Sequence, residues 1–266
     1  MRMVLVSVVT PFLLLAQMRP QTPELRQEAA REIAQLSRQL RFTDTPSAQR
    51  YRAVREEVTA KIQARVDQYI GSTVKPASLD PSVVRQDLDF LLTPESFDPE
   101  YSGPPFVAAG EAGNARSLIV AYMLVRGGTA VNDSFVTIRG YSGVNGHFQL
   151  VTSNSVDFEG YGLFAAELSS PSPAEQWILV WGPRFGFNGT KLRTRVYAFD
   201  GHAFRTVWNP RDVLNGKVIV AGNGFSVEHL DEQHYYVEGV PPYTLHDDYT
   251  VSQKGIEQTA SHHLSE

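Results

Sequence analysis

The chain has 266 residues, a formal net charge of −5 and no cysteine. Without cysteine there can be no disulfide bond, thiol nucleophile or cysteine-ligated zinc site, so burial of apolar side chains must hold the fold together. The acidic balance argues against nucleic acid as a partner, because contact with phosphates needs clustered positive charge.

The first sixteen residues have the pattern of a secretory signal peptide. Arg2 supplies a positive charge, Val4–Ala16 is largely apolar, and the small residue Ala16 ends the run. The run is shorter than the roughly 20 apolar residues that a membrane-spanning helix needs. We therefore expect residues 1–16 to be removed, no transmembrane segment after their removal, and a secreted or periplasmic protein.

Residues 17–92 are predicted to be helical. Thr22-Pro23 and Thr45-Pro46 each combine a capping hydroxyl with a proline at the first helical position. Apolar residues then recur every three or four positions. The pattern predicts a helical hairpin over 22–41 and 46–70 and a short helix over 81–92. Two apolar stripes make a thin core, so the hairpin must pack on another part of the chain or on a second copy.

Residues 93–116 are rich in proline and glycine, which interrupt regular elements. We expect a linker here, and with it the domain boundary. From 117 to 256, short runs of strand-forming residues alternate with turn signals, which predicts an antiparallel β domain. Leu118–Val125 is a continuous apolar run and is expected to be a strand buried on both faces. Residues 257–266 are expected to form a polar tail.

A faint internal repeat runs through the β domain. Gly146-His147 resembles Gly201-His202, and Gly255 follows, the three glycines being 55 and 54 residues apart. Each interval has room for about four strands, close to one blade of a β-propeller. Three units are too few to close a propeller. The predicted fold is therefore mainly β with an N-terminal α-helical hairpin, its strands forming an antiparallel meander of propeller-blade-like repeats or a β-sandwich.

The segment 177–191 offers a candidate binding site. It begins as a strand and continues as a loop in which Phe185 and Phe187 are flanked by glycines, beside Arg184 and Asn188. Exposed aromatic rings with a guanidinium and an amide can stack on a sugar or grip a protein. We therefore expect a protein or a carbohydrate as the partner of these four residues. The alternative is that both rings fold back and plug one end of the sheet.

A second candidate is a metal site at His246, Asp247 and Asp248. Histidine and carboxylate side chains are suitable ligands for zinc or iron, and four more histidines lie in the last forty residues. No H-E-x-x-H motif accompanies them, so the alternative is a set of solvated polar residues. We expect no bound cofactor.

No catalytic motif stands out in the sequence. Neither a G-x-S-x-G turn nor a G-x-x-x-x-G-K phosphate loop occurs. We therefore interpret the chain as an exported, non-enzymatic protein of a bacterial envelope that acts by binding or as structure. In a eukaryotic secretory pathway, Asn132 and Asn188 would be glycosylation acceptors. The alternative function is a secreted hydrolase with an acidic or a His/Asp metal site in the β domain.

Overall fold

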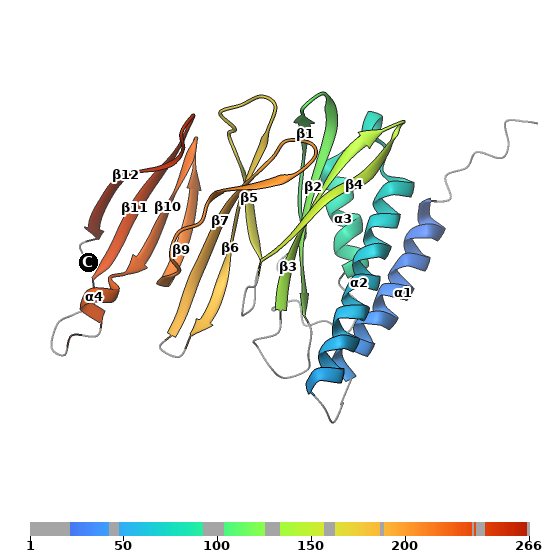
Figure 1. Ribbon diagram of the computed structural model, residues 1–266, viewed down its shortest axis with the longest axis horizontal. Helices are drawn as coiled ribbons and strands as arrows, with labels where there is room; N and C mark the ends of the chain where they lie inside the picture. The colour runs from blue at the N-terminus through green and yellow to red at the C-terminus, as the bar shows by residue number, and fades with distance from the viewer. Residues whose placement is uncertain are drawn as a thin grey trace, which may run out of the picture.

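The protein is mainly β, with a few helices. Its structure, a computed structural model, describes residues 22–42, 48–92, 104–125, 134–156, 163–186, 189–235, 237 and 243–264. The predicted signal peptide lies outside these residues. The sheets are antiparallel and do not close into a barrel (Figure 1). No helix among the described residues is long and apolar enough to cross a membrane.

Three main helices form the amino-terminal part. They are α1 (Thr22–Phe42), α2 (Ala48–Thr73) and α3 (Pro81–Leu92), with the short 3-10 helix η1 (Pro76–Ser78) before α3. Their buried apolar residues recur every three or four positions, which gives each helix one face for packing. Arg65 of α2 joins α2 to α1, its Nε lying 2.7 Å from Oε2 of Glu32.

The first sheet has four strands in sequential order. They are β1 (Phe106–Ala112), β2 (Ala115–Val125), β3 (Ser134–Val144) and β4 (His147–Val156). On β2, Leu118 and Val120 belong to the core shared with the helices. Ile119 and Ala121, which point the other way, belong to the core shared with the second sheet. The prediction that this apolar run is buried on both faces is confirmed.

The second sheet has eight strands. They are β5 (Phe164–Leu168), β6 (Gln176–Gly186), β7 (Gly189–Phe199), β8 (Phe204–Trp208), β9 (Val213–Ala221), β10 (Gly224–Leu230), β11 (Thr244–Ser252) and β12 (Gly255–Leu264), with α4 (Glu232–Tyr235) before β11. The order is β12-β11-β10-β9-β7-β6-β5, and β8 pairs with the other side of β7. β7 and β9 pair at Lys191–Leu214 and Leu192–Val213, near the start of both strands. Beyond this junction the sheet folds over, so that β9–β12 cover one face of β5–β8.

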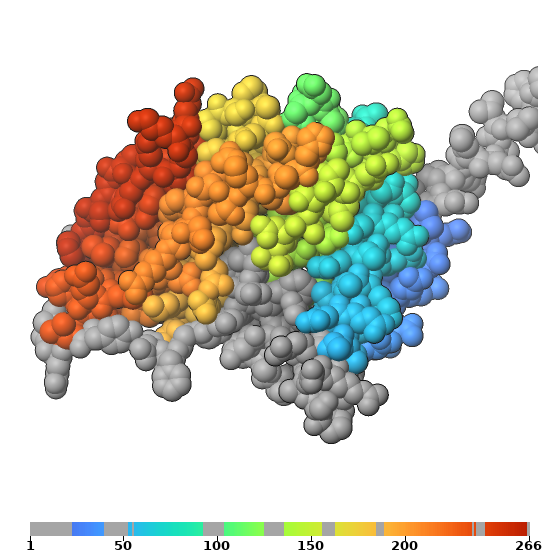
Figure 2. Space-filling model, in the orientation of Figure 1, coloured from blue at the N-terminus to red at the C-terminus, as the bar shows by residue number. Residues whose placement is uncertain are grey.

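Three apolar cores hold the layers together. The first lies between the helices and β2–β4, the second between the two sheets, and the third between β5–β8 and β9–β12. The layers therefore follow one another across the molecule in chain order, from the helices in blue to β12 in red (Figure 2). Because the first core combines helix and strand residues, the helices complete the packing of the first sheet.

Two segments differ from the sequence-based expectation. The range 93–116, expected to be a linker, contains β1, which pairs with β2 from Phe106–Ala121 to Ala112–Ala115. Small side chains such as Ala108 let β1 approach the second sheet closely, which outweighs the local signals of glycine and proline. The range 257–266, expected to be a polar tail, lies largely in β12, an edge strand whose backbone groups on one side pair with β11.

Candidate functional site

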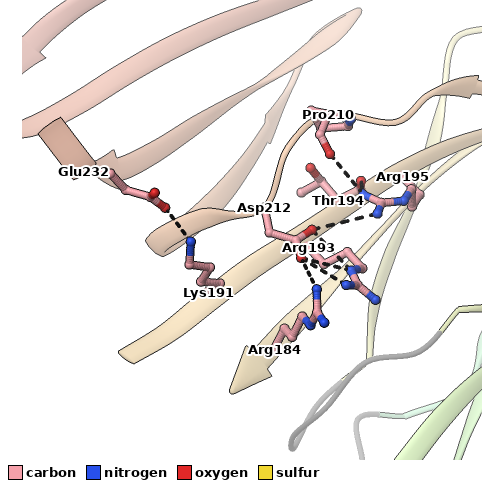
Figure 3. A network of polar contacts seen from close by, with 8 residues as sticks. All are labelled: Arg184, Lys191, Arg193, Thr194, Arg195, Pro210, Asp212 and Glu232. Atoms are coloured by element: carbon pink, nitrogen blue, oxygen red, sulfur yellow. Dashed lines mark hydrogen bonds and ion pairs between the residues drawn. The ribbon is translucent and has the colours of Figure 1, made fainter. Parts of the chain in front are cut away.

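Arg184, one of the predicted binding residues, belongs to a cluster of charged side chains (Figure 3). Its Nη1 donates to Oδ2 of Asp212 at 3.1 Å, and Nη2 of Arg193 donates to the same oxygen at 3.0 Å. Nη2 of Arg195 lies 3.8 Å from Oδ1. Three arginines from β6 and β7 therefore meet one carboxylate, which comes from the connection between β8 and β9.

The register of β6 and β7 explains why the arginines gather. Arg184 pairs with Lys191, and alternate residues of a strand face the same side, so Lys191, Arg193 and Arg195 project from the face that carries Arg184. Lys191 has its own partner, with Nζ 2.9 Å from Oε1 of Glu232 in α4. The cluster is thus a set of paired charges on one face, near the end of the second sheet.

The surroundings of Asp212 keep it ionised. Burial alone would raise its pKa, but hydrogen bonds from Arg193 and Arg184, with the nearby positive charges, outweigh burial and hold the pKa below its ordinary value. Its side chain is 13% exposed, whereas that of Arg184 is 42% exposed. The carboxylate therefore holds the arginines in place, and the Arg184 side chain is partly exposed.

The other predicted residues of this site are only partly placed. The backbone of Phe185 pairs with Thr190 near the end of β6, but its side chain is outside the described part. Phe187 and Asn188 also lie outside the described residues. Whether the two rings contact a partner or plug the sheet stays a prediction.

Sequence reasoning missed Arg193, Arg195 and Asp212. The two arginines had a signal, because they alternate along a strand that follows Arg184 closely in the chain. Asp212 had none, since its contact with Arg184 spans 28 residues and depends on how β9 joins β7. Arg184, the exposed member of the cluster, therefore lies in the segment that the sequence indicated. The carboxylate that holds it, Asp212, comes from the connection between β8 and β9.

The predicted metal ligands lie on β11, where alternation separates them. Nε2 of His246 lies 3.1 Å from Oδ1 of Asp248, and its Nδ1 lies 3.4 Å from Oε1 of Glu228. Asp247 points to the opposite face, where its Oδ2 lies 3.0 Å from Nε2 of His229. The structure does not bring the three predicted ligands together, and the described residues contain no group of three metal-ligating side chains.

A pocket of about 370 Å³ opens between α2 and the first sheet. It is lined by Glu56, Thr59, Ala60 and Gln63 of α2 and by Thr137, Ser153, Asn154 and Ser155 of β3 and β4. The sequence has no motif for this pocket, because its two walls are about 70 or more residues apart in the chain. Among the described lining residues, Glu56 is the one titratable side chain.

A buried ion pair lies on the same helix–sheet interface. Nε of Arg139 donates to Oδ1 of Asp67 at 2.6 Å, its Nη2 contacts the second oxygen, and Tyr141 donates its hydroxyl to Oδ1 at 2.6 Å. Burial alone would lower the pKa of Arg139, but the hydrogen bonds to Asp67 and the nearby phenols raise it above its ordinary value. This pair fixes α2 against β3.

Comparison with known proteins gives no assignment, because no protein family and no curated protein matches the chain.

Proposed function

We propose that the protein is exported and acts in a bacterial envelope by binding a partner or as structure, rather than as an enzyme. The charged and apolar pattern of residues 1–16 supports export. The Arg184 cluster, defined as Arg184, Arg193, Arg195 and Asp212, supports binding and is the contact surface that we assign to the partner.

The observation that carries the proposal is the way in which Asp212 holds three arginines. General acid–base catalysis needs titratable groups that converge where a substrate can reach them. Asp212 is instead engaged by guanidinium groups, which do not exchange protons near neutral pH. A fixed and partly exposed arginine is a frequent anchor of protein interfaces. The geometry therefore favours recognition over proton transfer.

We further infer that the strands form an open array of four-stranded units. Gly146, Gly201 and Gly255 lie at the turn between the third and fourth strands of β1–β4, β5–β8 and β9–β12. All three have positive φ angles, of 78°, 91° and 124°, which glycine adopts without steric cost. The recurrence of this turn supports a repeat that resembles propeller blades but stays open.

Photo-crosslinking in the native host tests the proposed contact surface. A photoreactive amino acid at Arg211, an exposed residue next to Asp212, should give an adduct with a partner, and one at Lys254, an exposed residue in the β11–β12 turn, should not. Excess purified wild-type protein, added to isolated envelopes, should suppress the adduct more strongly than the Arg184→Ala protein does. Equal labelling at both positions, or no adduct at position 211, would contradict the proposal.

Export is tested by the amino terminus of the protein isolated from its host. We expect it to begin after Ala16, and we expect Leu13→Arg to block export because a charge interrupts the apolar run. An isolated protein that still begins at Met1 would rule out signal cleavage. Turnover of nitrophenyl esters or glycosides by the purified protein would favour the hydrolase instead.

A further inference from the structure

The pocket between α2 and the first sheet has a polar helix wall where a packed helix usually presents apolar residues. Glu56, Thr59 and Gln63 follow one another at intervals of three and four residues, so they lie on one face of α2. One turn further on, Asp67 continues this face and pairs with Arg139. Glu56 is exposed and Gln63 is half-buried, so water can solvate both, whereas Thr59 is buried and needs a partner for its hydroxyl.

Thr59 is the clearest unpaired group in this wall. It is 7% exposed, and its Oγ1 is buried without a hydrogen-bond partner. Thr73 in the same helix shows the usual solution, since its Oγ1 donates to the carbonyl oxygen of Tyr69 at 2.7 Å. Because Thr59 lines the pocket, a change of its χ1 rotamer would bring this hydroxyl to a molecule that enters the pocket.

The opposite wall has matching chemistry. It consists of three hydroxyls from Thr137, Ser153 and Ser155 and of the backbone of Asn154, whose side chain points to the other face of the sheet. Hydroxyl and amide groups both donate and accept hydrogen bonds, as the hydroxyls of a sugar do. The described walls contain no aromatic ring and no cation, so hydrogen bonds rather than stacking or charge would select the ligand.

Two charged groups narrow the class of ligand. Arg139 lies behind Thr137, with Nη1 3.5 Å from its Oγ1, but Asp67 already neutralises the guanidinium. An anion would therefore meet the Glu56 carboxylate without a compensating cation from the described lining. A carboxylate accepts several hydrogen bonds, which suits neighbouring hydroxyls on one ring.

We propose that this pocket binds an uncharged, polyhydroxylated ligand of one or two sugar rings. Its volume of about 370 Å³ is at the lower end of the range for small-molecule pockets. The inference rests on the proposed binding function and adds a ligand class to it. Because the crosslink at position 211 tests a different surface, failure of sugar binding would leave that result standing.

Calorimetric titration of the purified protein tests the ligand class. Glucose, galactose, N-acetylglucosamine and maltose would each be titrated up to about 10 mM, which detects weak binding. Thr59→Val removes the hydroxyl at nearly constant volume, and Thr73→Val makes the same change outside the pocket. We expect at least one sugar to bind, Thr59→Val to raise its Kd about fivefold or more, and Thr73→Val to leave it within about twofold.

Thermal stability distinguishes a ligand group from a structural one. Since Thr59→Val removes a buried hydroxyl that lacks a partner, its Tm should equal or exceed that of the wild type while its affinity falls. If that variant misfolds, Ser153→Ala on the opposite wall gives the same affinity test. The inference is overturned if no sugar binds, if the pocket variants that fold bind as well as wild type, or if inorganic phosphate binds more tightly than the sugars.

Discussion

Two clusters of arginine and carboxylate use the same chemistry in different surroundings. Asp67 and Arg139 lie between α2 and the first sheet, where the Arg139 side chain is 7% exposed. Asp212 holds its arginines near the end of the second sheet, where Arg184 is 42% exposed. Each carboxylate accepts hydrogen bonds from more than one side chain, so the two clusters differ in burial. A buried ion pair contributes to folding, whereas a partly exposed arginine can also be contacted by another molecule.

The buried cluster lies beside the core that joins helices and strands. Ile62, Val66 and Leu88 from the helices pack with Leu118 and Val120 of β2. The proline-rich range before β1 suggests that the β domain folds alone, but this shared core favours the opposite outcome.

Removing the helices should have the largest effect. A fragment of residues 104–264 would expose the β2 side chains that the helices cover, including Leu118, Val120 and Tyr122. We expect this fragment to show no cooperative thermal transition when its unfolding is followed by circular dichroism, and to bind a hydrophobic dye. A fragment with a sharp, cooperative transition would show instead that the strands form an independent domain.

Asp67→Ala should destabilise the full chain by about 3–5 kcal/mol, because it leaves a buried guanidinium without its partner. It also removes the acceptor of the Tyr141 hydroxyl. Urea denaturation measures the change in the free energy of unfolding. The double variant Asp67→Leu/Arg139→Met is the control and should recover most of the loss, since it removes both charges together. If Asp67→Ala costs less than about 1 kcal/mol, the pair does not fix α2.

Asp212→Asn should have a smaller and pH-dependent effect, of about 1–3 kcal/mol near neutral pH. The folded pKa of Asp212 is lowered, so its ionised form contributes stability above the ordinary carboxyl pKa. That contribution is lost as pH falls through the lowered pKa. The difference between wild type and variant should therefore shrink between about pH 5 and pH 2. A difference that does not change with pH would argue against an ionised anchor.

Local patterns predict the elements of this fold better than its contacts. The spacing of apolar residues indicates helices where α1, α2 and α3 lie, and Gly146 and Gly201 mark turns. The pairing of Asp67 with Arg139 spans 72 residues and depends on how α2 packs on β3. Such contacts leave no local signal in the sequence, because polar residues that face a pocket and polar residues that face water occur at the same intervals along a helix or a strand.

The candidate metal site shows what a local rule could have excluded. Once residues 244–252 are taken as a strand, alternation places Asp247 on the face opposite to His246 and Asp248. For the Arg184 cluster, the same alternation rule accounts for only part of the site. Alternation groups Arg193 with Arg195, but the position of Asp212 follows from the junction of β7 with β9.

The central claim is that Arg184 is displayed for recognition and is not needed for folding. The most direct measurement is the free energy of unfolding of Arg184→Ala, compared with wild type and with Asp67→Ala under the same conditions. Because Arg184 is 42% exposed, its pair with Asp212 should behave as a surface ion pair, and the loss should be below about 1 kcal/mol. A loss above about 2 kcal/mol would show that Arg184 belongs to the structural framework and would contradict the claim.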